Sequence, residues 1–204
     1  MRVLVACEFS QVVCKAFRNK GHEAYSNDVL PTEGKPSWHI QCDIKELLRS
    51  RFISSVNLLI AHDPCTYQCN SGVRWLYEIP SRRELLKESC ELTKLLLNND
   101  VPKISRENPI PHRYALELIG MDYAQLIQPH FFIGSNESKA TCLWLKNLPK
   151  LKRTQWLDKS EIKQSVWRMP PGETRGQERS RFPVSIAEAM AEQWGNEVES
   201  DIEL

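Results

Sequence analysis

The 204-residue sequence lacks any apolar run near the roughly 18 residues that a membrane span requires. Its first residues lead directly into a short strand-like run and do not have the pattern of a signal peptide. Internal repeats and low-complexity tracts are also missing. The composition, 41% hydrophobic and 26% charged, is ordinary for a globular protein. These features exclude membrane, disordered, fibrous and small disulfide-rich secreted proteins. A chain of this length buries about 70% of its unfolded surface. We therefore predict one domain, residues 1–204, whose core requires neither a disulfide nor a metal.

Cysteine is present in an odd number: seven cysteines occur at irregular spacings, with no secretory segment before them. This pattern favours reduced thiols and a cytoplasmic location. Cys65 and Cys69 are spaced like half of a zinc site, but no second close Cys/His pair accompanies them. We expect no metal site.

The formal net charge of +1 hides an uneven distribution. Residues 1–138 carry 16 basic and 16 acidic side chains, residues 139–182 carry 11 and 4, and residues 183–204 carry none and 6. A basic segment next to an acidic end suits a face that binds polyanions. A lysine-rich surface loop followed by an acidic helix explains the same pattern. Within this part we separate a basic irregular insertion, 147–182, from an acidic tail, 197–204.

Strand-like and helix-like segments alternate along the first 124 residues. The expected strands are 2–9, 22–29, 38–42, 56–62 and 102–106, and the expected helices are 11–20, 44–51, 81–98 and 112–120. This alternation is typical of an α/β, doubly wound parallel sheet. Residues 125–133 and 141–146 then predict a hairpin, and 184–194 a final helix.

Polar residues fall where the expected strands end. The carboxyl ends of parallel strands lie along one edge of a sheet, and ligands bind there. The residues at these positions are Glu8, Phe9, Ser10, Asp28, Asp43, Asp63, Pro64, Cys65, Glu107 and Asn108. We expect them to line one rim.

The first strand–turn–helix lacks the G-x-G-x-x-G of dinucleotide-binding folds. Asp28 nevertheless lies about 20 residues beyond the first turn, where an acid accepts hydrogen bonds from a ribose hydroxyl. Asp43 follows the third strand, in a place suited to an adenine amino group. Either residue alone is also explained as a turn aspartate. Together they suggest a ligand that contains adenosine.

Cys65 and Glu107 carry the more specific chemistry. A thiol just past a buried strand can face a cleft and act as a nucleophile once its pKa is lowered, although structural cysteines are commoner. A carboxyl at the next strand end, Glu107, can protonate or hydrogen-bond a ring nitrogen and its exocyclic amine. The competing explanation of Asn108, before Pro109, is a helix N-cap.

Pro64-Cys65 after one strand and Glu107-Asn108 after the next resemble the motifs of the cytosine-5 DNA methyltransferases. The resemblance implies an S-adenosylmethionine-dependent, Rossmann-like sheet in which the cysteine adds to C6 of cytosine. It further implies that Glu107 engages N3 and the amine, and that C5 receives the methyl group. The cofactor contacts that it implies are Glu8, Phe9, Ser10, Asp28, Asp43 and Asp63.

The family's Gln-x-Arg-x-Arg motif has two candidate counterparts, 137–141 by chain order and 177–181 by literal match. We favour the first, because the second lies in the irregular basic stretch. The candidate substrate contacts are Ser71, Gly72, Arg74, Lys139, Thr141, Arg179 and Arg181. Basic residues of 139–182 would bind phosphates.

Longer runs at 30–33, 69–76, 107–110 and 139–146 are most similar to short phage-borne proteins of this family. This implies the cytoplasm of a bacterial host as the location. The implied partner is duplex or single-stranded DNA, or a cytosine nucleotide.

Three departures from the family pattern leave alternatives open. Asp63 stands where a second proline is common, and a charge there would raise the pKa of Cys65. Gln11 stands where a glycine would allow the backbone close to the cofactor, and nothing resembles a large target recognition domain. A catalytically degenerate protein that binds a nucleotide, S-adenosylmethionine or a host protein, such as a phage inhibitor, is the main alternative. A base-modifying enzyme with another donor is the third.

Overall fold

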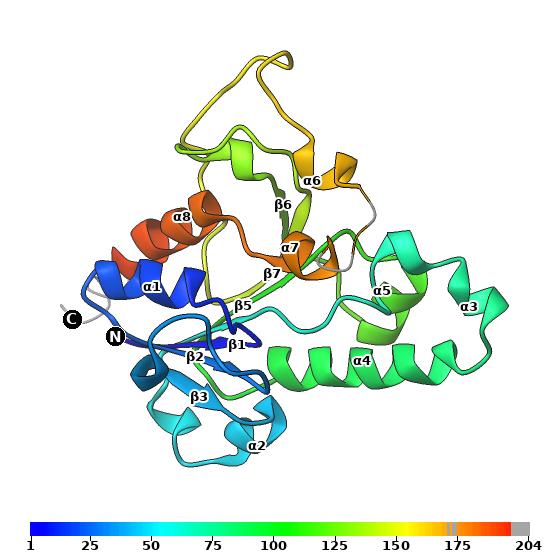
Figure 1. The fold of residues 1–204 in the computed structure, drawn as a ribbon. Coiled ribbons are helices and arrows are strands. Elements are labelled where there is room, and N and C mark those ends of the chain that lie inside the picture. Colours follow the sequence, from blue (N-terminus) through cyan, green and yellow to red (C-terminus); the bar gives the residue numbers. More distant parts are fainter. Residues whose placement is uncertain (171, 173–174, 197–204) are drawn as a thin grey trace.

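A seven-stranded sheet forms the centre of the computed structural model, which describes residues 1–170, 172 and 175–196 (Figure 1). The strands are β1 (Arg2–Ala6), β2 (Glu23–Asp28), β3 (His39–Gln41), β4 (Leu58–Ala61), β5 (Lys103–Asn108), β6 (Gln125–Ile127) and β7 (Thr141–Lys146). Their order is β3-β2-β1-β4-β5-β7-β6. β1 to β5 are parallel, whereas β7 runs antiparallel between β5 and β6. The expected doubly wound, Rossmann-like sheet with its terminal hairpin is confirmed.

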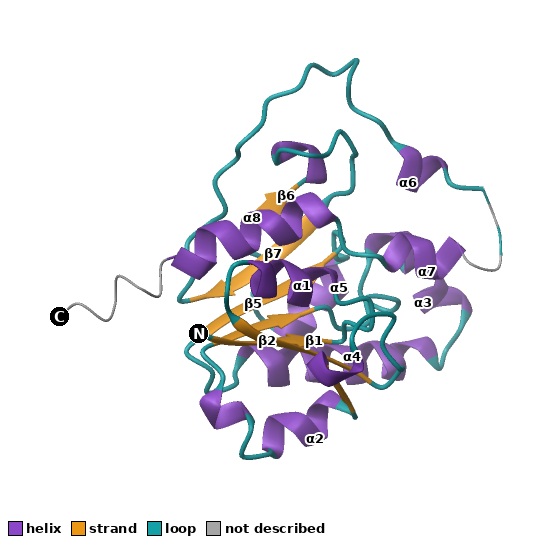
Figure 2. Ribbon diagram, turned by 60° about the vertical axis from the view of Figure 1, so that its left-hand side comes forward, coloured by secondary structure: helices purple, strands orange, loops and turns teal. Residues whose placement is uncertain are grey.

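Helices cover both faces of this sheet. They are α1 (Val12–Asn19), α2 (Ile44–Arg49), α3 (Trp75–Glu78), α4 (Arg82–Leu97), α5 (Arg113–Ile119), α6 (Ser165–Arg168), α7 (Arg175–Ser180) and α8 (Val184–Gly195). α1 and α8 pack side by side on one face, and α2, α4 and α5 lie on the other (Figures 1 and 2). Short 3₁₀ turns occupy Pro36–Trp38, Ile53–Ser55, Asn70–Gly72 and Pro129–Phe131.

The apolar pattern of the sequence explains these layers. β4 is buried along its whole length, as expected for a strand with helices on both sides. Alternate residues of β1 enter opposite cores, Val3 and Val5 toward α1 and α8, and Leu4 and Ala6 toward α2 and α4.

The observed elements differ from the expected ones mainly at strand ends and in the basic segment. β5 continues through Glu107 and Asn108, which we expected beyond the strand. β6 ends at Ile127, because Pro129 has no N–H to donate to a ladder and begins a 3₁₀ turn. The basic insertion 147–182 has no regular secondary structure over much of its described length, but it contains the short helices α6 and α7. The acidic tail 197–204 lies outside the described residues.

No described helix is both long and apolar enough to cross a membrane.

Candidate active site

Neighbouring strands β4 and β5 bring His62 and Glu107 together. Ala61 pairs with Arg106 in the parallel ladder, so the next residues on the two strands lie level with each other. His62 Nδ1 lies 3.1 Å from Glu107 Oε2, and the two side chains are only 10% and 13% exposed. The pair therefore lies within the rim, largely shielded from water.

His62 is a site residue that the sequence did not identify. Its ring centroid lies 4.5 Å from that of Phe182, which precedes α8. Among the described residues, its Nε2 is buried without a hydrogen-bond partner. Only the β4–β5 register reveals this placement, because 45 residues separate His62 from Glu107 in the chain.

Glu107 is held in its ionised form. Burial raises the pKa of this carboxyl, but the hydrogen bond and charge of His62, with the charges of Lys139 and Arg106, outweigh that effect and lower the pKa. Glu107 is thus a hydrogen-bond acceptor in this state.

Lys139 extends the site from the segment before β7. Burial lowers the pKa of its ammonium, while the negative charge of Glu107 acts in the opposite direction. Its Nζ donates to the carbonyl oxygen of Arg181 at 2.8 Å. The structure therefore brings the two candidate counterparts of the Gln-x-Arg-x-Arg motif next to each other.

Cys65 shares its proton with Cys69 one turn later. The backbone N–H of Cys69 donates to the carbonyl oxygen of Cys65 at 3.0 Å, and the two thiols are hydrogen-bonded. The Cys69 sulfur accepts from Cys65, from the Ser71 hydroxyl and from the Gly72 N–H, and these bonds lower its pKa to about 5. The bond to Cys69, burial and the charge of Glu107 raise the pKa of Cys65. The hydrogen bond between them therefore favours the protonated thiol at Cys65 and the ionised form at Cys69.

Asp63 does not have either of the roles that we expected. Its carboxylate forms a buried bidentate ion pair with Arg106, at 2.7 and 3.0 Å, and accepts from Thr93 Oγ1 at 2.7 Å. Both oxygens are therefore occupied within the fold, and Asp63 is not available as a cofactor ligand. The hydrogen bond to Cys69, burial and the charge of Glu107, not Asp63, raise the pKa of Cys65.

Asn108 and Pro64 lie apart from the reactive side chains. Successive strand residues point to opposite faces, so Asn108 lies on the α4 side of the sheet while Glu107 faces the α8 side. Asn108 is buried with neither amide atom bonded to a described residue. It is not a helix N-cap, because His112 caps α5. Pro64 is exposed, and its carbonyl oxygen accepts from Ser89.

The first turn of the fold is shaped without glycine. The buried carboxylate of Glu8 accepts from the N–H groups of Val13 and Cys14, at 2.6 and 3.1 Å, at the start of α1. Burial raises the pKa of Glu8, although the charge of His62 and these N–H groups oppose the rise. Glu8 therefore fixes the turn and cannot offer both oxygens to a ligand.

Phe9, Ser10 and Gln11 complete this turn. Gln11 adopts the left-handed conformation with φ of 60°, and its amide bonds to Ser26 and to the backbone of Lys35. The Phe9 carbonyl accepts from Thr32 Oγ1 and from the Glu33 N–H. Ser10 is half-buried. The loop 32–35 is thus hydrogen-bonded to this turn, in which Gln11 stands where the cytosine-5 methyltransferase pattern has a glycine.

Asp28 and Asp43 lie at the same rim as Cys7. Burial raises the pKa of the Cys7 thiol, and the charges of Asp63, Asp28 and Asp43 raise it further. Each aspartate also has a local role: Asp28 accepts from the Leu30 N–H at 3.0 Å, and Asp43 caps α2 through the Lys45 N–H at 2.8 Å. The turn-aspartate explanation and the ligand explanation are therefore compatible.

The remaining substrate candidates are distributed around Cys65. Ser71 and Gly72 hold the Cys69 sulfur, and Arg74 is exposed with its guanidinium 4.3 Å from the Trp75 ring centroid. Thr141 is buried, and its hydroxyl donates to the Lys139 carbonyl. Arg179 is half-buried and close enough to Lys139 to contribute to lowering its pKa. Arg181 forms a bidentate ion pair with Glu33 at 2.8 Å, in the loop that is bonded to the turn at Phe9.

Within the part of the chain that is described, no group of three or more His, Cys, Asp or Glu side chains could hold a metal ion.

Comparison with known proteins gives fold-level matches only. No family model and no curated protein matches the chain. A solved structure assigned as a DNA modification methyltransferase encoded within a prophage (E. coli) matches with a TM-score of 0.43 and 12% identity, over 71% of this chain and 46% of that one. The S. pombe Dnmt2 methyltransferase matches with a TM-score of 0.45 and 16% identity, over 85% of this chain and 56% of that one. The chain thus spans about half the length of these two proteins.

Proposed function

We propose that the protein is an S-adenosylmethionine-dependent methyltransferase that acts on C5 of cytosine in DNA. The observation that carries the proposal is the convergence of Cys65 and Glu107, which lie at the carboxyl ends of β4 and β5, with Lys139, which lies just before the antiparallel β7. Each of the three contributes to the charge environment of another. They lie in a sheet whose antiparallel β7 is inserted between β5 and β6.

The cofactor side of the rim fits a cationic adenosine compound. Asp28 and Asp43 present carboxylates beside Cys7, and the Asn27 Oδ1 is buried without a partner among the described residues. Their negative potential favours a positively charged sulfonium over a neutral ligand. Asp28 and Asp43 would hold the adenosine, and the backbone at Phe9 and Ser10 would face the methionine part. When bound, the cofactor supplies the methyl group.

The chain's own residues would prepare the base. Cys65 passes its proton to the Cys69 sulfur as its own sulfur bonds to C6. Glu107 accepts a hydrogen bond from the exocyclic amine and, in its protonated form, donates one to N3. Lys139 balances the charge of Glu107. A cytosine in duplex DNA would first have to leave the stack, which costs a few kcal/mol.

Covalent trapping tests the assignment of Cys65. Wild-type protein, Cys65→Ala and the matched control Cys90→Ala would be incubated with S-adenosylmethionine and DNA that contains 5-fluorocytosine. We expect a covalent adduct with the wild type and with Cys90→Ala, which lies on α4 away from the rim, and none with Cys65→Ala. An adduct that persists in Cys65→Ala would remove this residue as the nucleophile.

A binding protein with a degenerate site is the second candidate, and the observation that favours it is the glycine-free turn. The Gln11 side chain lies so close to Gly34 that a Cβ there would collide with it, and Thr32 and Glu33 are bonded to Phe9. Calorimetric titration with S-adenosylmethionine, together with an assay of methyl transfer, distinguishes the methyltransferase from the degenerate binding protein. No heat of binding would reject the methyltransferase proposal, and binding without methyl transfer to any DNA would favour the degenerate protein.

A further inference from the structure

A group of exposed and half-buried arginine and aromatic side chains lies beyond Cys65, on α3 and at the starts of α4 and α5. We propose that this group, called the Arg–aromatic surface and formed by Arg74, Trp75, Tyr77, Arg82, Arg113 and Tyr114, binds the single-stranded nucleic acid that flanks the target base. The inference deepens the proposed function by naming the substrate as unpaired, and it rests on that function for the position of the cytosine.

The Arg–aromatic surface is attached to the reactive loops by backbone bonds. The Asn70 N–H donates to the Ile110 carbonyl at 2.9 Å, and the His112 N–H donates to the Gln68 carbonyl at 3.0 Å. Cys69 and Pro111 form an isolated bridge between them. The loops that follow Cys65 and Glu107 are therefore tied into one unit, which fixes the surface relative to both residues.

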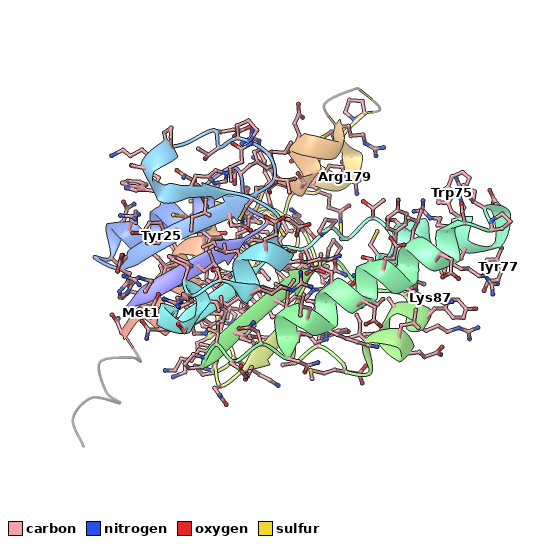
Figure 3. The ribbon with its side chains drawn as sticks, turned by 90° about the horizontal axis from the view of Figure 1, so that it is seen from below. Met1, Tyr25, Trp75, Tyr77, Lys87 and Arg179 are labelled. Carbon is pink, nitrogen blue, oxygen red and sulfur yellow. The ribbon has the colours of Figure 1, made fainter. Side chains whose placement is uncertain are left out.

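The aromatic rings are paired with guanidinium groups. Arg74 lies 4.3 Å from the Trp75 ring centroid, and Arg113 lies 4.7 Å from that of Tyr114. Tyr77 and Tyr114 meet edge to face, with centroids 6.3 Å apart, and their hydroxyls are hydrogen-bonded. Tyr77 is nevertheless 64% exposed. Figure 3 shows Trp75 and Tyr77 at the end of the molecule opposite Met1 and Tyr25.

Basic side chains outnumber acidic ones at the Arg–aromatic surface. The arginines of α3 and of the first turns of α4 and α5 are Arg74, Arg82, Arg83 and Arg113, and the carboxylates there are Glu78 and Glu84. Glu84 pairs with Lys87 at 2.8 Å, and Glu117 lies one turn further along α5. Over the described residues, neither Arg74 nor Arg113 forms a salt bridge. Their guanidinium groups are thus available for phosphates.

Stacked aromatics with free guanidinium groups suit an unpaired strand. Bases stack on exposed rings while cationic side chains follow the phosphates, and this mode needs no sequence reading. In a duplex the faces of the bases are already covered by their neighbours, so the rings would have nothing to stack on. A single strand also presents its cytosine without the cost of flipping it from a duplex.

Binding measured without cofactor or turnover tests the surface. Fluorescence anisotropy would compare a labelled, cytosine-containing oligonucleotide in single-stranded and duplex form, at constant low salt. The variants are Trp75→Ala, Tyr77→Ala and the conservative Tyr77→Phe, which retains the ring. Arg49→Ala, an exposed arginine at the end of α2, is the charge control. Thermal unfolding would establish that each variant is folded.

We expect the wild type to bind the single strand more tightly than the duplex, and each alanine variant to lose about tenfold in affinity. Tyr77→Phe and Arg49→Ala should bind like the wild type. Tighter binding to the duplex, or alanine variants that bind as well as the wild type, would overturn the inference. Absent methylation with intact, surface-dependent binding would count against the proposed function alone.

Discussion

At the scale of single residues, Asp63 and Arg106 form an ion pair with almost no access to solvent. Removing one member of a buried pair leaves the other charge uncompensated, which typically costs about 3–5 kcal/mol. We expect Asp63→Ala to lower the free energy of unfolding by about that amount, because Arg106 would retain only Gln68 as a polar partner. Urea titration would measure the loss. Asp28→Ala is the control, and an equally large effect there would contradict this assignment.

The two acids of the site should affect stability in opposite directions as the pH changes. The folded pKa of Glu107 is lowered, so its contribution is present above the unfolded pKa of about 4.3 and is lost as the pH falls through the folded pKa. The folded pKa of Glu8 is raised by burial, so its contribution is lost as the pH rises from about 4.3 through the folded pKa.

Unfolding free energies measured from about pH 3 to pH 7 would test this pair. Relative to the wild type, Glu107→Gln should gain less stability as the pH rises through the acidic range. Glu8→Gln should not show the loss of unfolding free energy that an ionised, buried Glu8 causes as the pH rises. Identical pH profiles for the two variants would show that the pKa values of Glu107 and Glu8 are not shifted in opposite directions.

The Cys69 thiolate gives a prediction that does not depend on any enzymatic activity. With a pKa of about 5, Cys69 is ionised in mildly acidic solution, where an ordinary thiol is protonated. A low pKa also weakens the nucleophile, so we expect a net gain of only about fivefold over an ordinary thiol in alkylation rate at about pH 6. Mass spectrometry after iodoacetamide treatment would locate the label. Cys69→Ala should lose the fast phase, and Cys42→Ala should keep it.

At the scale of elements, Asp43 at the start of α2 combines an observed capping role with the ligand-binding role that we propose. Replacement by alanine removes the N-cap of α2 and should destabilise the protein by about 1 kcal/mol. Asparagine caps almost as well but carries no charge. We therefore expect Asp43→Asn to retain stability and Asp43→Ala to lose it, while both weaken S-adenosylmethionine binding in calorimetry. Unchanged cofactor affinity in Asp43→Asn would restrict the residue to capping.

The elements that the sequence predicted well are those with strong apolar periodicity. α4 and α8 were expected within one or two residues of their observed ends, because their buried residues recur at helical spacing. α3, α6 and α7 were not expected, since each has at most six residues and too few turns to show a period.

The candidate site, too, could be predicted from the sequence only in part. Adjacent strand ends could be expected to bring Cys65 and Glu107 to one rim, because parallel strands end at one edge. The pairing of His62 with Glu107, and of Asp63 with Arg106, depends on the register of two strands and on which face each side chain enters. Neither the register nor the choice of face is encoded in a local pattern.

At the scale of the whole molecule, the basic segment 139–182 meets the rim through Lys139 and the Arg181 carbonyl, and Arg181 itself is held by Glu33. The Arg–aromatic surface follows the reactive cysteine loop on the other side of Cys65. Two positive regions thus adjoin the loop of Cys65, although the protein as a whole is nearly neutral. A polyanion that crosses the rim would contact both.

Salt dependence should reveal the contribution of the basic segment. Lys152 and Lys159 are exposed within it, and each phosphate contact to a single strand adds about 0.7 to the slope of log affinity against log salt concentration. We expect the double variant Lys152→Glu/Lys159→Glu to weaken DNA binding at low salt and to reduce that slope by about 1.4. The charge-matched control is the double variant Lys45→Glu/Lys87→Glu, at exposed lysines of α2 and α4 outside the basic segment. Anisotropy titrations at several salt concentrations would give each slope. If Lys45→Glu/Lys87→Glu changed the slope as much as the variant in the basic segment does, the effect would come from net charge, and the segment would not be a phosphate-binding face.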